Sequence, residues 1–262
     1  SIPAYWRKII LLFVCKMYRL LKRIVPMRID KYLANMNVGS RKEVHVLIKK
    51  GIVTVNGDVV KTPKQQVKES DEVLVDGQEI NYQKYHYFLM NKPKGVLSAT
   101  EDRSQRTVIS LLKPQDQYQG ITPVGRLDKD TTGLLLLTND GQLNHKLLAP
   151  NKHVDKIYRA KIAGVADDET VKIFASGMTL GDSTKLKPAE LKILSQDEEH
   201  DSSEIEIRIR EGKYHQIKRM FGAVGMKVVE LERISMGKLK LPKDLKRGEY
   251  IELNLDDVSK IK

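Results

Sequence analysis

The spacing of apolar residues between positions 29 and 48 predicts two short helices. Apolar side chains recur there every three or four residues, which places them on one face of each helix. Gly39 ends the first helix and Gly51 the second, since glycine favours the left-handed conformation that closes a helix. Ser40 and Glu43 match a capping box at the start of the second helix.

A β-hairpin is predicted after the second helix. The segment VTVNGDVV at 53–60 places Asn56-Gly57 between β-branched residues, and this dipeptide favours a two-residue hairpin turn. The segment EVLVDG at 72–77 predicts a further strand. Residues 27–84 therefore form a small unit of two helices and a hairpin, followed by a short linker.

Residues 85–262 combine strands with interspersed helices. The segment SEIEIRIRE at 203–211 alternates polar and apolar residues, so one face of this strand is buried. The run LLLLT at 134–138 is typical of a strand buried on both faces. Because no regular strand–helix–strand alternation is present, we expect an α+β domain with a largely antiparallel sheet. Further strands are predicted at 87–92, 156–165, 189–195 and 240–253, and helices at 106–112, 141–148 and from about His215.

The composition is that of a soluble globular protein with an anionic partner. Of 262 residues, 40% are hydrophobic and 31% charged, and the net charge is +12. Cys15 is the single cysteine, which excludes an internal disulfide and suits the reducing cytoplasm. The sequence has no Cys or His spacing typical of a metal site, and we expect no metal.

Residues 1–26 carry six Lys and Arg and no acidic residue, which is half of the net charge. The apolar run from Ile9 to Val14 is too short to span a bilayer. A basic amphipathic helix on a membrane surface is one interpretation. We favour an extension outside the fold, because the regular pattern begins at Met27, and we expect no membrane partner.

Basic residues gather on the helical part of the 27–84 unit. This segment, with its helix–turn–helix and VTVNG hairpin, resembles the αL-type RNA-binding domain of a ribosomal small-subunit protein and of tyrosyl-tRNA synthetases. The resemblance implies contacts with RNA phosphates and shape. The candidate RNA-binding residues here are Arg28, Lys31, Arg41, Lys42 and Lys49.

The segment GRLDKDTTGLLLLTNDG at 125–141 has three interpretations. A calcium loop would use Asp128 and Asp130, but the position of its bidentate glutamate is occupied by Asn139. A turn explains Asn139 and the following Asp140, which we expect to cap a helix, and it leaves Asp130 bonded to nearby amides. Arg126 and Asp128, two residues apart at the edge of a buried strand, favour a catalytic carboxylate.

The segment EGKYHQIKRMFGAV at 211–224 offers a cation for this carboxylate. Its apolar residues form a helical stripe, and Lys218 lies at the border of that stripe. Lys218 can therefore reach the edge of the core, or it extends along that edge into solvent. Arg219 points away from the stripe, toward solvent or an RNA phosphate.

Five segments together resemble the pseudouridine synthases, in particular the RsuA family that modifies ribosomal RNA. They are the RNA-binding module, NKPKGV at 91–96, the segment 125–141, KIY at 156–158 and EGKYHQIKRM at 211–220. The resemblance covers residues 27–262. Within the family, HQIKRM and PNKHVDKIY resemble the enzymes that act on small-subunit rRNA.

The resemblance also implies roles for individual residues. Asp128 would be the nucleophile, and Tyr158 would stack on the target base and take its proton. Lys218 would pair with Asp128, although many relatives have an arginine there, whose fork lysine cannot reproduce. Ile217 maps to the apolar wall of the base pocket. Arg126 would fill the gap left by the flipped nucleotide.

The implied reaction breaks the N-glycosidic bond of uridine and joins carbon 5 of the base to the ribose. Asp128 would attack either the ribose or the pyrimidine ring. The reaction requires no cofactor, and we expect a monomeric cytoplasmic enzyme acting on small-subunit rRNA. The alternatives are an enzyme acting on large-subunit rRNA, and a non-catalytic RNA-binding factor in ribosome assembly.

Overall fold

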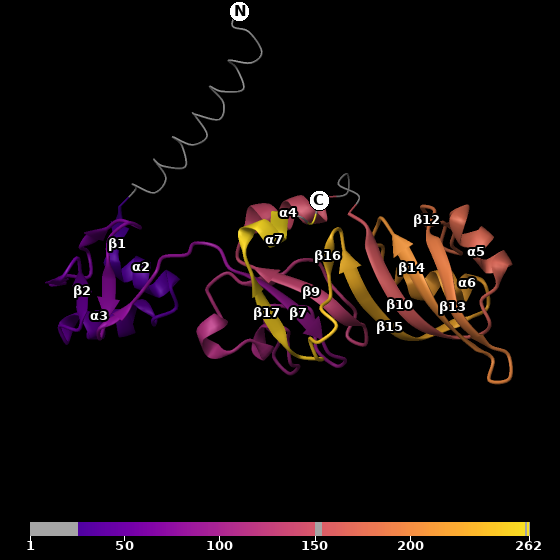
Figure 1. The fold of residues 1–262 in the computed structure, drawn as a ribbon, viewed down its shortest axis with the longest axis horizontal. Helices are drawn as coiled ribbons and strands as arrows, with labels where there is room; N and C mark the ends of the chain where they lie inside the picture. The colour runs from indigo at the N-terminus through magenta and orange to yellow at the C-terminus, as the bar shows by residue number, and fades with distance from the viewer. Residues whose placement is uncertain (1–25, 150–153, 260, 262) are drawn as a thin grey trace, which may run out of the picture. The chain divides into compact units, whose positions relative to one another are not determined.

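The computed structural model describes residues 26–149, 154–259 and 261, and these divide into two compact units at the boundary between Lys84 and Tyr85 (Figure 1). The proposed extension, including Cys15, lies outside the described residues except for Pro26. None of the helices in the described part is long and apolar enough to cross a membrane.

The first unit packs two helices against short antiparallel strands. The helices are α2 (Ile29–Asn35) and α3 (Arg41–Lys49). Strand β1 (Met27–Arg28) pairs with β4 (Gln66–Val67). A separate sheet has the strand order β3 (Asp58–Val59), β2 (Val53–Val55), β5 (Val73–Val75) and β6 (Gln78–Glu79).

The predicted capping box and hairpin turn of this unit are confirmed, and the first helix ends earlier than predicted. The Glu43 amide donates to Ser40 Oγ at 3.3 Å, and the Ser40 amide donates to Glu43 Oε2 at 2.6 Å. Asn56 forms the first residue of the hairpin turn with a φ of 50°. The first helix ends at Asn35 rather than at Gly39, because Asn37 adopts a φ of 57° and closes the helix earlier.

A buried carboxylate ties the two helices of this unit together. Asp30 is fully buried, and Arg28 donates to its two oxygens from Nε at 3.1 Å and from the terminal guanidinium at 2.7 Å. His45 Nε2 on α3 lies 3.1 Å from Asp30 Oδ2. Burial alone would raise the pKa of Asp30, but the hydrogen bonds from His45 and Arg28 outweigh it and lower the pKa. Arg28, expected to bind RNA, is therefore engaged by a carboxylate of its own module.

The second unit is built on a mainly antiparallel sheet, as the sequence predicts (Figure 1). Its main strand order is β13 (Glu190–Asp197), β14 (Ser202–Ile209), β10 (Lys156–Ala163), β15 (Lys227–Met236), β9 (Thr132–Thr138), β7 (Tyr87–Lys92) and β17 (Tyr250–Leu253). Strand β8 (Thr122–Pro123) pairs with β9, and β16 (Leu239–Lys240) pairs with β15. Only β9 and β15 pair in parallel among the described strands.

Four helices accompany this sheet in the described residues: α4 (Gly141–Leu148), α5 (Asp168–Ala175), α6 (Gln216–Ala223) and α7 (Leu255–Ser259). Asp140 caps α4 by accepting a hydrogen bond from the Leu143 amide at 3.1 Å, as predicted. The helix predicted at 106–112 is only a 3₁₀ turn at Ile109–Leu111. Its first residues stay extended because Val108 donates to the Leu97 carbonyl at 2.9 Å.

Strand β9 is buried on both faces, and its four leucines separate into two cores. Leu135 and Leu137 pack in the cluster that contains α5 and α6, whereas Leu134 and Leu136 pack with residues of α7. Gly133 has a φ of 105°, and a Cβ there would overlap the carbonyl oxygen of Arg233 on β15. Glycine therefore permits the close approach of the two parallel strands.

We predict that Asp30→Asn weakens the first unit by about 2 kcal/mol, because charge-assisted hydrogen bonds from Arg28 and His45 are lost. Native-state hydrogen exchange in α2 and α3 of the full chain would measure the free energy of opening. Asp58→Asn is the matched control, because Asp58 is exposed on β3. Equal exchange in the two variants would contradict a structural role for the buried carboxylate.

Candidate active site

Asp128 lies in the loop between β8 and β9, and that loop is anchored on both sides of it. Leu127 is buried, its amide donates to Ser98 Oγ at 3.1 Å, and the same hydroxyl donates to the Leu127 carbonyl at 3.0 Å. Arg126 is exposed at the mouth of the pocket that Asp128 also lines. Because Leu127 points into the core, its two polar neighbours remain on the side of the pocket.

Lys92 anchors the part of this loop that follows Leu127, residues 128–131. It ends β7, is fully buried, and its ammonium donates to the carbonyls of Asp128 and Lys129 at 3.1 Å and of Thr131 at 2.8 Å. A fourth bond of 3.0 Å goes to the Pro93 carbonyl. Burial lowers the pKa of Lys92 to about 8, although the charges of Asp130 and Asp128 act to raise it. The loop conformation is therefore built around one buried cation.

Helix α6 brings a second cation to Asp128. Its apolar residues Ile217, Met220 and Phe221 are buried against the sheet, which leaves Lys218 at the border of the core. Lys218 Nζ lies 3.2 Å from Asp128 Oδ2, so the sequence prediction that these groups meet is confirmed. The helix starts at Gln216, after a left-handed residue with a φ of 46°.

That left-handed residue is His215, and it contributes a third group to the site. Its Nε2 lies 3.3 Å from Asp128 Oδ1, so the carboxylate is held between His215 and Lys218. The His215 ring stacks on Tyr214, with ring centroids 3.9 Å apart. The sequence offered little signal for this contact, because histidine at a helix start is usually a polar surface residue.

Asp130 is the other carboxylate of the site. Its Oδ1 accepts a hydrogen bond from Lys218 Nζ at 2.8 Å, which is shorter than the distance from Lys218 to Asp128. This hydrogen bond is the main cause of the lowered pKa of Asp130. Burial would lower the pKa of Lys218, but its bonds to the two carboxylates outweigh burial and raise it. The expectation that Asp130 bonds mainly to loop amides is therefore wrong, because the distant Lys218 reaches it.

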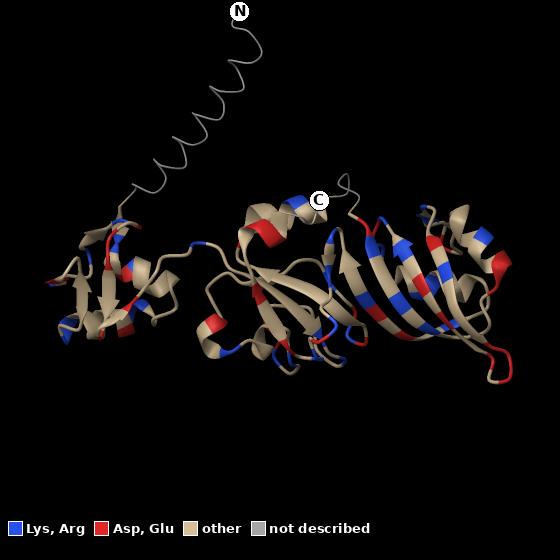
Figure 2. Ribbon diagram, in the orientation of Figure 1, with Lys and Arg blue, Asp and Glu red and all other residues tan. Residues whose placement is uncertain are grey.

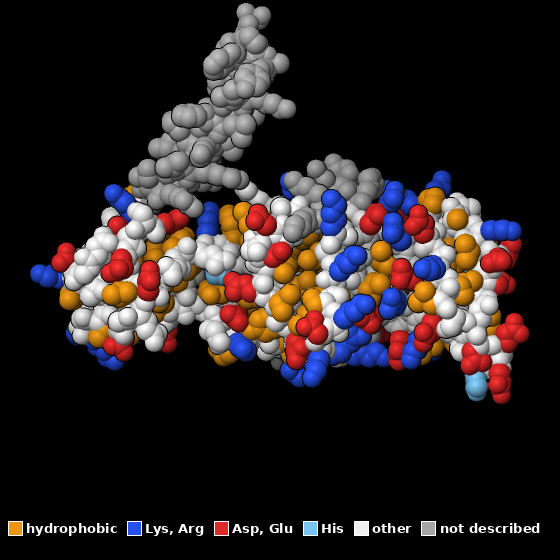
Figure 3. All heavy atoms as spheres, in the orientation of Figure 1, with side chains coloured by type: hydrophobic (Ala, Val, Ile, Leu, Met, Phe, Trp, Pro, Cys, Tyr) orange, Lys and Arg blue, Asp and Glu red, His pale blue; other side chains and the backbone are white. Residues whose placement is uncertain are grey.

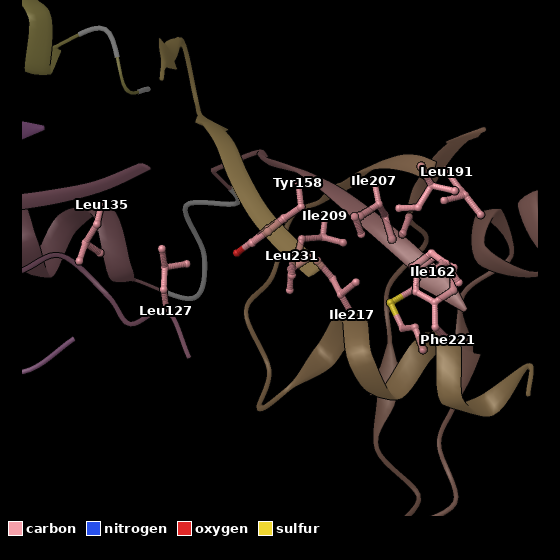
Figure 4. Packing of buried hydrophobic residues seen from close by; sticks show 14 of the residues in the cluster. Leu127, Leu135, Tyr158, Ile162, Leu191, Ile207, Ile209, Ile217, Phe221 and Leu231 are labelled. Atoms are coloured by element: carbon pink, nitrogen blue, oxygen red, sulfur yellow. The ribbon is translucent and has the colours of Figure 1, made fainter. Parts of the chain in front are cut away.

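The wall of the pocket opposite these charges is apolar and aromatic. Tyr158 projects from β10 toward the loop of Leu127, with Ile209, Leu231 and Ile217 beside it (Figure 4). Tyr158 is 9% exposed, and the cavity has a volume of about 90 Å³. A carboxylate with a paired cation thus faces a flat aromatic ring, which is a suitable setting for covalent chemistry on a planar base.

The predicted RNA-binding residues differ in what they contact. Lys31, Arg41, Lys42 and Lys49 are exposed and have no ion pair with a described carboxylate. Arg219 instead pairs with Asp182 at 2.5 Å. It also donates to a backbone carbonyl of the preceding turn at 3.4 Å. The helical periodicity predicted that Arg219 points away from the core, but it could not show that the carboxylate of Asp182 lies beside it.

Comparisons with known proteins show which families the two units match. Residues 86–223 match the family model described as RNA pseudouridylate synthase, and residues 27–73 match the S4 domain model. YtzG of Bacillus subtilis, an uncharacterized RNA pseudouridine synthase, is 46% identical over 88% of this chain and 97% of its own length.

Two further relatives are named for different ribosomal subunits. Ribosomal large subunit pseudouridine synthase B of Bacillus subtilis is 39% identical over 90% of this chain and 95% of its own length. Ribosomal small subunit pseudouridine synthase A of Vibrio cholerae is 38% identical over 90% of this chain and 99% of its own length. A crystal structure of a pseudouridylate synthase has a TM-score of 0.62 and 33% identity, and covers 90% of this chain and all of that chain.

We predict that Lys92→Met loosens the loop 125–131 selectively, because buried carbonyls lose their donor at a cost of about 1–3 kcal/mol each. Hydrogen exchange of peptides covering the loop should accelerate by at least about tenfold, and the melting temperature should fall. Lys94→Met is the matched control, since Lys94 is exposed two residues away. Unchanged exchange in Lys92→Met would show that the loop does not depend on this ammonium.

Proposed function

The chain belongs to the RNA pseudouridylate synthase family and is therefore an isomerase, and we propose that it converts one specific uridine of ribosomal RNA to pseudouridine. The observation that carries this proposal is the Asp128 carboxylate, held by Lys218 and His215 in a pocket walled by Tyr158. In this proposal, the unit that matches the S4 domain at residues 27–73 makes a second, separate contact with the RNA.

Asp128 is the nucleophile in this proposal. The ammonium of Lys218 stabilises the ionised carboxylate, and His215 fixes the second oxygen so that the carboxylate keeps one orientation. During the reaction the bond between N1 and the ribose breaks, a bond from carbon 5 to the ribose forms, and the proton on carbon 5 moves to N1. The product is an isomer of the substrate, so the chemistry balances without a cofactor.

Tyr158, Ile217 and Arg126 position the uridine. Tyr158 supplies an aromatic face for stacking and a hydroxyl for the proton of carbon 5, and Ile217 completes the apolar wall. Arg126 is exposed and has no ion pair in residues 26–149 or 154–259, so it is available to enter the RNA helix. Extrusion of a base costs a few kcal/mol, which such an insertion partly offsets.

We propose a small-subunit rRNA target and a monomeric enzyme in the cytoplasm. The segments HQIKRM and PNKHVDKIY favour this target, together with the small-subunit relative of Vibrio cholerae. The similarity to the large-subunit enzyme of Bacillus subtilis favours the alternative, a uridine of large-subunit rRNA.

Mapping pseudouridines in both rRNAs, in cells with and without the protein, tests the function. We expect one small-subunit site to disappear without the protein and to return with the wild-type chain. A site lost from large-subunit rRNA would favour the alternative target. Unchanged maps would contradict the proposal of rRNA modification.

We predict that Asp128→Asn lowers the rate of pseudouridine formation by more than about a thousandfold, because the amide cannot form the covalent intermediate. Asp130→Asn is the matched control: it removes one partner of Lys218 and leaves the nucleophile, so a loss of about tenfold is expected. Tritium release from carbon 5 of labelled rRNA measures both rates. Comparable losses in the two variants would exclude a special role for Asp128.

The rate should also fall above about pH 8. Lys92 is protonated below its pKa of about 8, and above it the neutral amine has fewer hydrogens to donate to the loop carbonyls. The pKa of Lys218 is raised, so its own deprotonation lies at higher pH. Because the charge of Asp130 raises the pKa of Lys92, Asp130→Asn should move the midpoint to lower pH. A profile that is flat to pH 10, or a midpoint unaffected by Asp130→Asn, would contradict this assignment.

A further inference from the structure

A basic groove leads away from the pocket of Asp128 along one end of the sheet. Gly212 and Lys213 line that pocket and also a larger hollow of about 690 Å³, which is bordered by the end of α4 and the start of β12 (Lys185–Leu186). This hollow shares Lys187 and Arg210 with a third hollow of about 520 Å³. Because they share these residues, the three hollows adjoin one another, and together they are called the groove.

Six Lys and Arg side chains line the two larger hollows against two glutamates, and of these six Arg208 and Arg210 pair with Asp155. Lys156, Lys185 and Lys213 line the larger hollow, and none of them has an ion pair with a described carboxylate. Lys213 Nζ donates instead to the Lys185 carbonyl at 2.7 Å, and Lys156 Nζ donates to the Glu211 carbonyl at 3.4 Å. The ammonium groups of Lys156 and Lys213 are thus held by carbonyl groups, which carry no net charge.

The acidic side chains of the groove are occupied. Glu211 Oε1 accepts the Lys187 amide at 2.8 Å and the side-chain amide of Gln216 at 3.0 Å. Glu190 lies 3.6 Å from the guanidinium of Arg208. Both carboxylates therefore hold groups of the groove itself, and the charge of Glu211 also acts to raise the pKa of Lys156.

A buried arginine, Arg233, lies close enough to Lys156 for its charge to act on that lysine. Arg233 is 3% exposed, its Nε donates to the Leu134 carbonyl at 2.9 Å, and one terminal nitrogen has no partner among the described residues. Burial, and after it the charge of Arg233, lowers the pKa of Lys156, although the charge of Glu211 acts to raise it. Two neighbouring cations without a carboxylate partner create a site where an anion is strongly favoured.

The rest of this sheet has a different charge pattern. The hairpin between β13 and β14 carries Asp197, Glu198, Glu199 and Asp201, and lies at the opposite end of strands eight residues long (Figure 2). The two ends of these strands are roughly 25 Å apart, because a strand rises about 3.3 Å per residue. Blue and red side chains are interspersed on the face seen in Figure 3. On the middle strands of the sheet, Arg159 pairs with Glu206 and Lys161 with Glu230. The acidic hairpin and the basic groove therefore lie at opposite ends of these strands.

We propose that the groove holds the sugar–phosphate backbone of the RNA strand on one side of the flipped uridine. The inference rests on the proposed function and extends it, because it assigns a path to the substrate beyond the catalytic pocket. Lys213 and Lys156 contact the phosphates next to the target, and Lys185 and Lys187 contact those further along. The exposed Leu148 and its neighbours Leu147 and Val154 give an apolar wall for sugars and base faces.

The test compares two double variants that remove the same charge. Lys185→Gln/Lys187→Gln changes the groove without touching the pocket of Asp128. Lys172→Gln/Lys192→Gln is the matched control, because both lysines are exposed and line none of the described hollows. The probe is unmodified small-subunit rRNA made by transcription, with large-subunit rRNA in parallel. Filter binding at several salt concentrations and kcat and KM for tritium release are measured.

We expect the groove variant to raise Kd and KM about tenfold near physiological salt and to leave kcat within about twofold. The slope of log Kd against log salt should become shallower by about 1.4, since each of the two lost phosphate contacts on a single strand contributes about 0.7. Lys185→Arg/Lys187→Arg should retain wild-type affinity. The control pair should change neither Kd nor the slope.

The outcomes separate the groove from the proposed function. An active wild type whose groove variant behaves like the control pair would overturn the groove and leave the function standing. A wild type that forms no pseudouridine in either rRNA would overturn the function, and the salt slopes would still decide whether the groove binds RNA. A fall in kcat with unchanged KM and Kd would also contradict a backbone-binding groove.

Discussion

The candidate site depends on the double burial of β9. Its leucines pack alternately into two cores, so the strand cannot shift without disturbing both. Gly133 allows β15 to pair closely with the start of β9, and this pairing fixes the point where the preceding loop ends. A loop whose end is fixed in this way can present a carboxylate at a constant position, as a nucleophile requires.

Two lysines surround that carboxylate and its loop. Lys218 is shared between Asp128 and Asp130, and Lys92 offers its ammonium to the loop carbonyls below them. The two lysines have opposite pKa shifts, because Lys218 contacts carboxylates whereas Lys92 contacts only carbonyls in a buried position. Lys218 thus contacts the proposed nucleophile, whereas Lys92 stabilises the backbone of the same loop.

Much of the fold could be predicted from the sequence because its signals are local. The capping box at Ser40, the hairpin at Asn56 and the cap at Asp140 each depend on residues within a few positions of one another. The alternation in β14 and the four leucines of β9 likewise report burial directly. The segment 106–112 shows the limit: its pattern suited a helix, but pairing with Leu97 kept its start extended.

The sequence by itself determined the two units, the mainly antiparallel sheet, and Asp128 and Lys218 as a candidate pair, because periodicity and motif spacing are written along the chain. Only the tertiary structure decided that Asp130 shares Lys218, that His215 reaches Asp128, that Lys92 is buried, and that Arg28 and Arg219 pair with carboxylates. An exposed and a buried lysine look the same in sequence. Which of them finds a carboxylate depends on strands and helices that meet across the fold, from positions as far apart as 128 and 218.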